Sequence, residues 1–259
     1  MWETIEVTKR EHYAIVTLNR PDALNALSTQ MAKDIIAVMD ELSKDIDVWA
    51  VVLSGAGERA FCVGADLKER KSMTKDEMIR QRELFCDAFE AVVRFPKPIV
   101  AMVNGFAMGG GFEFALCCDM IVAAEEAFLG LPEVGLGIIP GGGGTQNLPR
   151  IIGKNKAKEL IYTGRKISGQ TAFEWGIANK VAPRGQLMEA TADLIREITK
   201  NAPLALQQAK RCVDLGVEVD LTAGMALEAE AYNRCLYSKD RDEGLKAFNE
   251  KRKPNYQGR

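Results

Sequence analysis

Two glutamates of this chain interrupt stretches that are otherwise apolar, and carboxyl groups in such places can transfer protons. Glu113 lies within Phe112–Leu116, and Glu133 is the only charged residue of Phe128–Pro140. Burial among apolar neighbours raises the pKa of a carboxyl group toward neutrality, which suits acid–base catalysis. An acidic residue at the start of a helix is also a common partner of the helix dipole, so this structural explanation stays open for Glu113.

Glycine-containing segments accompany both acids and can supply backbone N–H donors. Three consecutive glycines, residues 109–111, join a buried strand pattern to a helix, where unpaired N–H groups suit an anion or a developing oxyanion. Gly64 and Ala65 belong to another loop, in which the main chain can approach a ligand closely. Taken alone, the first segment also fits close helix packing, and the second fits a tight loop with Asp66 as a helix cap. Together with the two acids, they fit an acid–base pair around an oxyanion hole.

Other common catalytic arrangements do not fit the sequence. The glycines form neither the G-x-G-x-x-G pattern of dinucleotide-binding turns nor a P-loop, since no Gly-Lys-Ser/Thr follows them. The single histidine, His12, lies in an alternating strand pattern far from any glycine-rich turn, which argues against a Ser-His-Asp or Cys-His mechanism. The six cysteines include no C-x-x-C pair, which excludes the usual zinc spacings, so we expect no metal site.

The composition is that of an ordinary globular protein. The chain has 259 residues, 47% of them hydrophobic, with 34 basic and 36 acidic side chains and a net charge of −2. This balance provides no broad basic field for a phosphate backbone, so we expect no nucleic-acid binding. The first twenty residues lack the pattern of a secretory signal, and the longest apolar region, residues 98–124, is interrupted by polar residues and glycines. We therefore expect a cytoplasmic protein without membrane insertion.

Strand and helix patterns alternate in the first part of the chain. Ser28 is placed to cap one helix, and Thr74 with Glu77 predicts a capping box at the start of another. Strand patterns cover residues 4–8, 13–18, 48–53, 99–103 and 120–123. This alternation predicts a mostly parallel sheet with helices on its faces. From about Gly153 helices follow almost alone, and they need the core or a neighbouring subunit to pack against.

Three segments together resemble the signature segments of the crotonase (enoyl-CoA hydratase/isomerase) superfamily. They are residues 61–68, 104–113 and 131–146, and similar residues extend from 19–27 to 248–253, so the resemblance covers nearly the whole chain. Each segment is a loose motif, whereas their order and spacing together are specific. Glu113 and Glu133 match the two glutamates of the hydratases and are 133 − 113 = 20 residues apart, as in that branch. Isomerases lack one of these acids, so the resemblance favours hydration.

The resemblance also implies a fold and an assembly. The fold class is α/β, a crotonase-like spiral of ββα units with a C-terminal helical region. Residues 1–195 would form the spiral core domain, and residues 196–259 the helical region that completes the acyl pocket and makes trimer contacts. The expected partners are an acyl-CoA thioester and further copies of the chain, in a homotrimer or a homohexamer built as a dimer of trimers.

The resemblance further implies which residues act. The expected enzyme is a hydro-lyase that adds water across the C2=C3 bond of a 2-enoyl-CoA thioester to give a 3-hydroxyacyl-CoA, with no cofactor besides the coenzyme A of the substrate. The N–H groups of Ala65 and Gly110 would hold the thioester oxygen, Glu113 would be the base toward water, and Glu133 the proton donor. The residues expected to bind the substrate are Ala23, Leu24, Val63, Ala65, Asp66, Leu67, Lys68, Gly110 and Lys251.

Alternatives within and outside the enzyme class remain. Residues 137–146 are similar to the corresponding run of methylglutaconyl-CoA hydratases, which are one enzymatic alternative. Double-bond isomerisation of an enoyl-CoA is a second enzymatic alternative. Leu131 stands where short-chain hydratases often carry Gln, which leaves the acyl preference open. A non-catalytic acyl-CoA-binding or RNA-binding member of the fold is the alternative from another class. The early helix pattern, residues 31–44, is not a row of lysines, so we expect no RNA binding.

Overall fold

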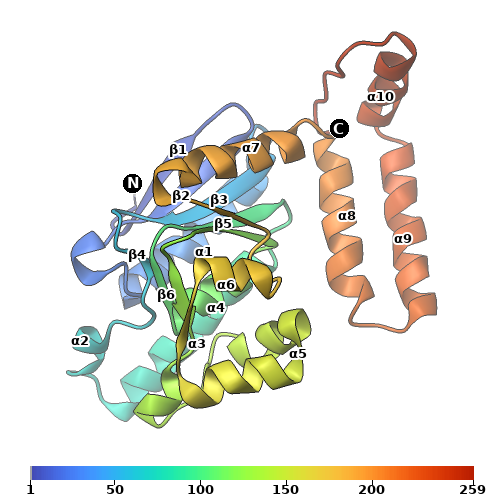
Figure 1. The fold of residues 1–259 in the computed structure, drawn as a ribbon. Helices are drawn as coiled ribbons and strands as arrows, with labels where there is room; N and C mark the ends of the chain where they lie inside the picture. Colours follow the sequence, from blue (N-terminus) through green and yellow to red (C-terminus); the bar gives the residue numbers. More distant parts are fainter. Residues whose placement is uncertain (1) are drawn as a thin grey trace.

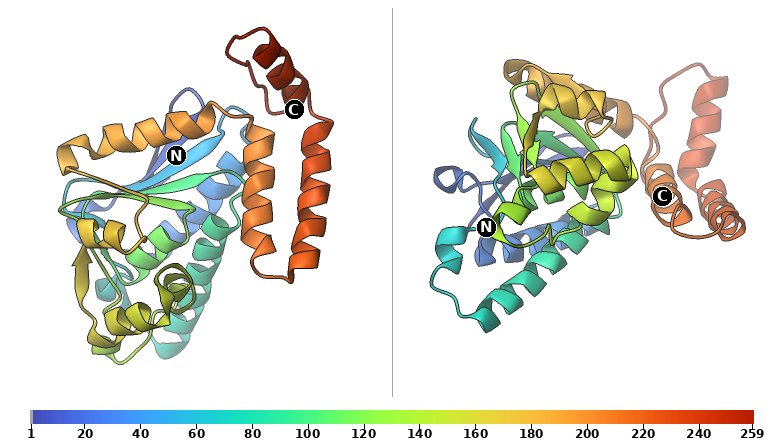
Figure 2. Two further views of the ribbon diagram at one scale, coloured as in Figure 1. Left: turned by 45° about the vertical axis from the view of Figure 1, so that its right-hand side comes forward. Right: turned by 60° about the horizontal axis from the view of Figure 1, so that its bottom comes forward.

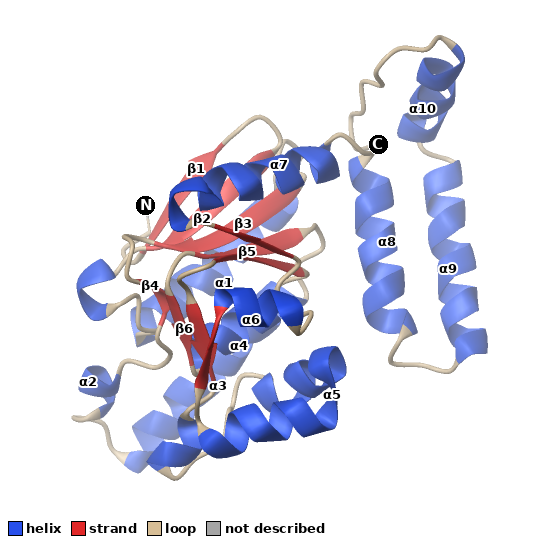
Figure 3. Cartoon of the chain, in the orientation of Figure 1, coloured by secondary structure: helices blue, strands red, loops and turns tan. Residues whose placement is uncertain are grey.

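Two β-sheets form the framework of the protein (Figure 1). A computed structural model describes residues 2–259. The larger sheet has six strands, in the order β1 (Ile5–Lys9), β2 (Tyr13–Leu18), β3 (Ala50–Gly55), β5 (Ile99–Val103), β7 (Met120–Ala124) and β10 (Lys180–Ala182). The smaller sheet has four strands, in the order β4 (Ala60–Cys62), β6 (Phe106–Met108), β8 (Phe128–Gly130) and β9 (Lys166–Ser168). The smaller sheet runs steeply away from the larger one (Figure 3).

A repeated unit connects the two sheets. The pairs β3 and β4, β5 and β6, and β7 and β8 each place their first strand in the larger sheet and their second in the smaller sheet. Within each sheet these strands are parallel to their neighbours from the other pairs, with Val52 beside Val100 in the larger sheet and Phe106 beside Phe128 in the smaller. Strand pairs followed by helices in this order form a spiral of ββα units, so the predicted fold class is confirmed.

The two helices with predicted caps form as expected. In α1 (Thr29–Lys44), Ser28 accepts a hydrogen bond from the Met31 N–H, and the apolar positions at helical spacing are buried. In α3 (Lys75–Val93), both halves of the capping box are present between Thr74 and Glu77. The two helices pack against each other, and α3 runs along one side of the smaller sheet (Figure 1).

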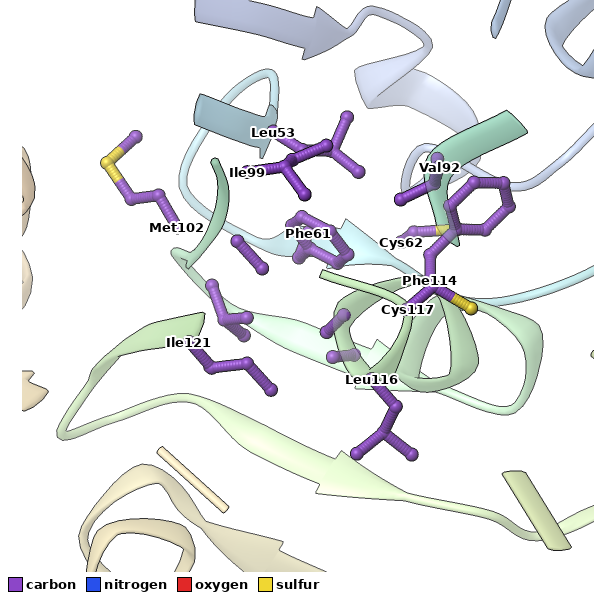
Figure 4. Packing of buried hydrophobic residues seen from close by; sticks show 14 of the residues in the cluster. Leu53, Phe61, Cys62, Val92, Ile99, Met102, Phe114, Leu116, Cys117 and Ile121 are labelled. Carbon is purple, nitrogen blue, oxygen red and sulfur yellow. The ribbon is translucent and has the colours of Figure 1, made fainter. Parts of the chain in front are cut away.

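The main core lies between the two sheets and α4 (Gly110–Leu116). Figure 4 shows Phe61 of β4 between the larger sheet, which contributes Leu53 and Ile99, and α4. Phe61 and Phe114 are fully buried. Helix α4 lies so close to β4 that a Cβ atom at Gly111 would be only 2.0 Å from the Cys62 carbonyl oxygen. The tight packing fixes the beginning of α4 relative to the loop that follows β4.

The C-terminal helices divide into two groups. Helices α6 (Gly169–Glu174) and α7 (Leu187–Thr199) pack on the sheets, and α7 buries Leu187, Thr191 and Ile195. Helix α5 (Gly144–Thr163) packs on the same body against α4. Helices α8 (Pro203–Gly216), α9 (Leu221–Leu236) and α10 (Lys239–Asn249) stand apart from this body (Figures 1 and 2). The expected division after residue 195 falls inside α7, which continues to Thr199 before the chain leaves the larger sheet.

The separated helices keep apolar side chains in solvent, among them Leu221 and Phe248, which are 79% and 82% exposed. Such a surface on a folded chain is typical of an interface that is formed with another molecule. In the part of the chain that the structure describes, no helix has both the length and the apolar composition needed to span a bilayer.

Candidate active site

A cavity of about 690 Å³ lies among α2 (Leu67–Arg70), α3, the start of α4 and the loop after β8. All the residues that line it fall between Leu27 and Gly142, so the separated C-terminal helices contribute none of its wall within one subunit. Most of the wall is apolar. The predicted Val63, Ala65, Leu67, Gly110, Glu113 and Glu133 all line this cavity.

Two hydrogen bonds to Leu27 fix the chain on either side of Ala65, so that the Ala65 N–H group points away from Leu27. Leu27 donates its N–H to the Gly64 carbonyl at 2.8 Å, and Asp66 donates its N–H to the Leu27 carbonyl at 2.9 Å. In this parallel bridge the N–H group of Ala65 points to the opposite side, toward the cavity. Gly64 has a φ of +84°, and a Cβ atom there would lie 3.1 Å from the Gly110 nitrogen, so glycine is needed on both counts.

The second N–H group comes from the junction of β6 and α4. Gly109 donates its N–H to the Gly130 carbonyl at 2.9 Å, with φ of 54° and ψ of −130°, a conformation that essentially only glycine adopts. Gly110 then begins the helix. Among residues 2–259, neither the Ala65 N–H nor the Gly110 N–H donates to a protein acceptor. Two unoccupied donors therefore border the same cavity and can bind one oxygen atom.

Glu113 lies on α4, one turn after Gly110, and is only 3% exposed. Its Oε1 atom accepts hydrogen bonds from the N–H groups of Gly142 and Gly144, both at 2.8 Å. Burial raises the pKa of Glu113, and the hydrogen bonds from the backbone oppose that rise because they favour the charged carboxylate. Glu113 is thus a carboxyl group held in a fixed orientation in a nearly dry site.

Glu133 is the first residue of a short 3₁₀ helix, η2 (Glu133–Leu136), and is 9% exposed. Its Oε2 atom is buried and has no hydrogen-bond partner among the described residues. Burial, together with a smaller contribution from the charge of Glu113, raises the pKa of Glu133 to about 7. A Cβ atom at Gly109 would lie 3.1 Å from Glu133 Oε1, which places this carboxyl group beside the start of α4. The two predicted acids are therefore brought together at the two open amides.

The remaining residues predicted to bind the substrate lie outside the wall of this cavity. Asp66 caps α2, accepting from the Lys68 and Glu69 N–H groups, and also pairs with Arg20 at 2.8 Å, so its carboxylate joins two loops. Lys68 is exposed, and Ala23 and Leu24 are partly exposed beside the 3₁₀ helix η1 (Pro21–Ala23). None of these four residues lines the cavity, whereas Leu67, which follows Asp66, does.

Lys251 is far from this site within one subunit. It follows α10, which lies on the opposite side of the molecule from α2 and α3 (Figure 1). Among the described residues, no group of His, Cys, Asp and Glu side chains is arranged to hold a metal ion. The single histidine, His12, stacks on Trp49 with ring centroids 3.8 Å apart and does not line the cavity.

Sequence reasoning missed the wall that faces the acids. Met78, Arg82, Phe85 and Phe89 of α3 line the cavity, and Arg70 of α2 joins them. Met78, Phe85 and Phe89 recur at helical spacing, but this spacing does not distinguish a helix face that packs in a core from one that lines a cavity. The loop of residues 136–142 closes another side of the cavity.

Two mostly parallel sheets joined in a ββα spiral, with a cavity that contains two buried carboxyl groups, place the protein among α/β folds with one enclosed site. Residues 8–259 match the family model described as enoyl-CoA hydratase/isomerase. The chain belongs to this family, within the crotonase superfamily.

Relatives with these names share nearly the whole length of the chain. It is 41% identical to the short-chain-enoyl-CoA hydratase of Clostridium acetobutylicum, over 95% of this chain and 94% of that protein. It is 37% identical to the crotonyl-CoA hydratase of Syntrophomonas wolfei, over 98% of both chains. The crystal structure of an enoyl-CoA hydratase from Bacillus anthracis superposes with a TM-score of 0.97, at 43% identity, and covers 99% of this chain and 100% of that one. These relatives support a crotonase-type enzyme that acts on acyl-CoA thioesters.

Proposed function

We propose that this protein is an enoyl-CoA hydratase that adds water across the C2=C3 bond of a 2-enoyl-CoA to give a 3-hydroxyacyl-CoA. The observation that carries the proposal is the unpartnered, buried carboxyl group of Glu133 beside the amide-bound carboxylate of Glu113. Both face the cavity that the open N–H groups of Ala65 and Gly110 border. The family membership supports the substrate class.

The proposed chemistry begins with the thioester carbonyl. Its oxygen accepts hydrogen bonds from Ala65 and Gly110, which stabilise the negative charge that builds there when water attacks C3. Glu113 takes a proton from the attacking water, and its two hydrogen bonds from Gly142 and Gly144 favour the charged form that this role needs. The C2=C3 electron pair moves to C2 and then binds the proton that Glu133 delivers. Water thus contributes OH to C3, and the acid replaces its lost proton from Glu113 or solvent.

Hydration is favoured over double-bond isomerisation by the presence of both carboxyl groups. Isomerisation moves one proton from C4 to C2 or back, which a single carboxyl group can perform. Two buried acids with opposite hydrogen-bond environments fit a reaction that needs a base and an acid at the same moment.

The same cavity supports a proposal for the oligomeric state. Because its wall comes from residues 27–142, the predicted completion of the acyl pocket by residues 196–259 requires another subunit. The exposed apolar faces of α8, α9 and α10 are available for such contacts. We propose a homotrimer, alone or doubled to a hexamer, in which Lys251 reaches the coenzyme A of a neighbouring subunit.

The test uses the full-length protein and crotonyl-CoA, and follows the loss of the conjugated enoyl-thioester absorbance. We expect Glu113→Gln and Glu133→Gln each to lower kcat by about 10²- to 10⁴-fold, the usual contribution of general acid–base catalysis. Glu197→Gln, an exposed position on α7, is the matched control and should keep full activity. Activity that survives both site substitutions would refute the assignment. Tight binding of coenzyme A thioesters without turnover would instead indicate a non-catalytic binding protein.

A further inference from the structure

One aromatic side chain touches both glycine segments that the proposed hydration needs. Phe89 of α3 lines the cavity and is 7% exposed. Its Cζ atom lies 3.6 Å from the position of a Cβ atom at Gly110, whose N–H group is one of the two open donors. A Cβ atom at Gly142 would lie only 2.4 Å from Phe89 Cε2 and 2.5 Å from Cζ. The backbone of Gly142 therefore lies directly against the ring.

The ring, rather than the backbone conformation, requires a glycine at position 142. The φ angle of Gly142 is outside the left-handed region, so this conformation would accept a residue with a side chain. A carbon–carbon distance of 2.4 Å is far below van der Waals contact, so a larger residue would displace either the ring or the loop. Close packing of Phe89 on Gly142 thus fixes the distance between α3 and the loop of residues 136–142.

This loop is held mainly near its end. Residues 135–139 are all exposed. At the end of the loop, Gly142 donates its N–H to Glu113 Oε1 at 2.8 Å, and its carbonyl accepts from the thiol of Cys117 at 3.8 Å. A thiol is a weak donor. The packing of Gly142 against Phe89 therefore helps to hold this N–H group on Glu113.

The ring of Phe89 is itself fixed from the side of the core. It packs on the ring of Phe114, with the two centroids 4.3 Å apart and the planes inclined by 36°. Phe114 is fully buried and follows Glu113 in α4. Phe89 therefore lies between the rigid core and the two glycine segments, and the positions of both segments depend on it.

We propose that Phe89 is a positioning residue, whose ring holds the N–H group of Gly142 on Glu113 and keeps this acid at a fixed distance from the open N–H group of Gly110. The inference rests on the proposed function, because it names the side chain that holds the base beside an oxyanion donor. The base and the donor must act on one substrate molecule at the same moment, and a misplacement of about 1 Å costs about 100-fold in rate.

The first experiment compares two substitutions that remove the same ring atoms from buried positions. Phe95→Leu is the matched control, because Phe95 is 2% exposed and does not line the cavity. With crotonyl-CoA we expect Phe89→Leu to lower kcat by about 10- to 100-fold, the effect of weakening a hydrogen bond to a charged group. Phe95→Leu should keep the wild-type kcat. Circular dichroism shows whether both variants are folded.

The kinetic constants also distinguish a positioning role from direct binding of the substrate. If Phe89 serves only as a surface for the acyl chain, Phe89→Leu raises KM and leaves kcat unchanged. That result overturns the inference, as does an equal decrease of kcat in Phe89→Leu and Phe95→Leu.

A second experiment tests the contact between the ring and the loop. In Gly142→Ala the new methyl group meets the Phe89 ring, so kcat should fall by at least 10-fold. Leucine lacks the Cε and Cζ atoms nearest to that methyl group, so the double variant Phe89→Leu with Gly142→Ala should have a higher kcat than Gly142→Ala alone. Independent losses that multiply in the double variant would overturn the inference.

A third measurement does not depend on turnover. Hydrogen exchange of peptides that cover residues 136–144, followed by mass spectrometry in the full-length protein, reports how often this segment opens. We expect faster exchange in Phe89→Leu than in Phe95→Leu. If faster exchange is found but no enoyl-CoA is hydrated, the proposed function fails and the positioning contact remains. If crotonyl-CoA is hydrated but the two variants do not differ in kcat, the inference fails alone.

Discussion

Glu113 and Glu133 are the same residue type on two walls of one cavity, yet their surroundings differ. On the α4 wall, Glu113 accepts two backbone hydrogen bonds at 2.8 Å. On the η2 wall, Glu133 has an oxygen without any partner in the described chain. Burial raises the pKa of both groups, and at Glu113 the hydrogen bonds from Gly142 and Gly144 oppose that rise.

This difference shows that the glycine-rich loop, rather than the acid itself, sets the role of each carboxyl group. Gly142 and Gly144 direct their N–H groups at one glutamate only. The other glutamate, with a pKa raised to about 7, keeps a proton near neutral pH and can deliver it. Substitutions that disturb one wall should therefore have effects distinct from those that disturb the other.

Of the two glycine substitutions that compare the walls, the larger effect is expected from Gly109→Ala, on the Glu133 wall. The new Cβ atom would lie 3.1 Å from Glu133 Oε1, in a backbone conformation with φ of 54° and ψ of −130° that alanine rarely adopts. We expect kcat to fall by about 10²- to 10³-fold, because the neighbouring Gly110 amide also moves. The strain should lower the free energy of unfolding by about 1 to 3 kcal/mol. Crotonyl-CoA turnover and urea unfolding measure the two effects.

Gly144→Ala is the matched substitution on the Glu113 wall. Its Cβ atom would lie 3.0 Å from Glu113 Oε1, but the φ angle of Gly144 is outside the region that favours glycine. Activity should fall while stability changes little, so the pair separates displacement of a carboxyl group from backbone strain. Equal losses of stability in the two variants would contradict this explanation.

The larger sheet was predictable from the sequence, whereas the smaller one was not. Strands such as β2 and β5 are five or six residues long, and their apolar patterns predicted them at the observed bounds. The strands β4, β6, β8 and β9 have three residues each, which is too short for an alternating pattern to be recognised. The loops after three of these strands carry the site, so the resemblance to a family found it where periodicity could not.

The candidate site was predictable only where a local motif marks it. The segments around Ala65, Gly110, Glu113 and Glu133 have recognisable glycine and acid patterns, and the structure brings them together. Arg70 belongs to no motif, and its position depends on how α2 packs beside α3 through Gln81. Such tertiary placement leaves no pattern in a single sequence.

The two walls should also differ in how they contribute to the dependence of kcat/KM on pH. Glu133 must be protonated to act as the acid, and its pKa is raised to about 7. We therefore expect kcat/KM to fall about tenfold for each pH unit above neutrality, and also to fall in acid when Glu113 becomes protonated. The residual activity of Glu133→Gln should lack the alkaline decline. An identical decline in that variant would assign the titrating group elsewhere and remove the difference between the two walls.

The smallest effect is expected on stability. A carboxyl group whose pKa is about 7 in the folded state and lower in the unfolded chain stabilises the fold only while it is protonated. The free energy of unfolding should therefore decrease as pH rises through 7, and Glu133→Gln should remove this decrease. At pH 8 we expect the variant to be more stable than the wild type by about 1 to 3 kcal/mol, with no such gain at pH 4.5. Glu113→Gln should gain less, because it weakens the hydrogen bonds that Gly142 and Gly144 donate to a charged oxygen. Urea unfolding at both pH values measures these differences. An equal gain in the free energy of unfolding for the two variants would mean that the two walls stabilise a charged carboxylate equally.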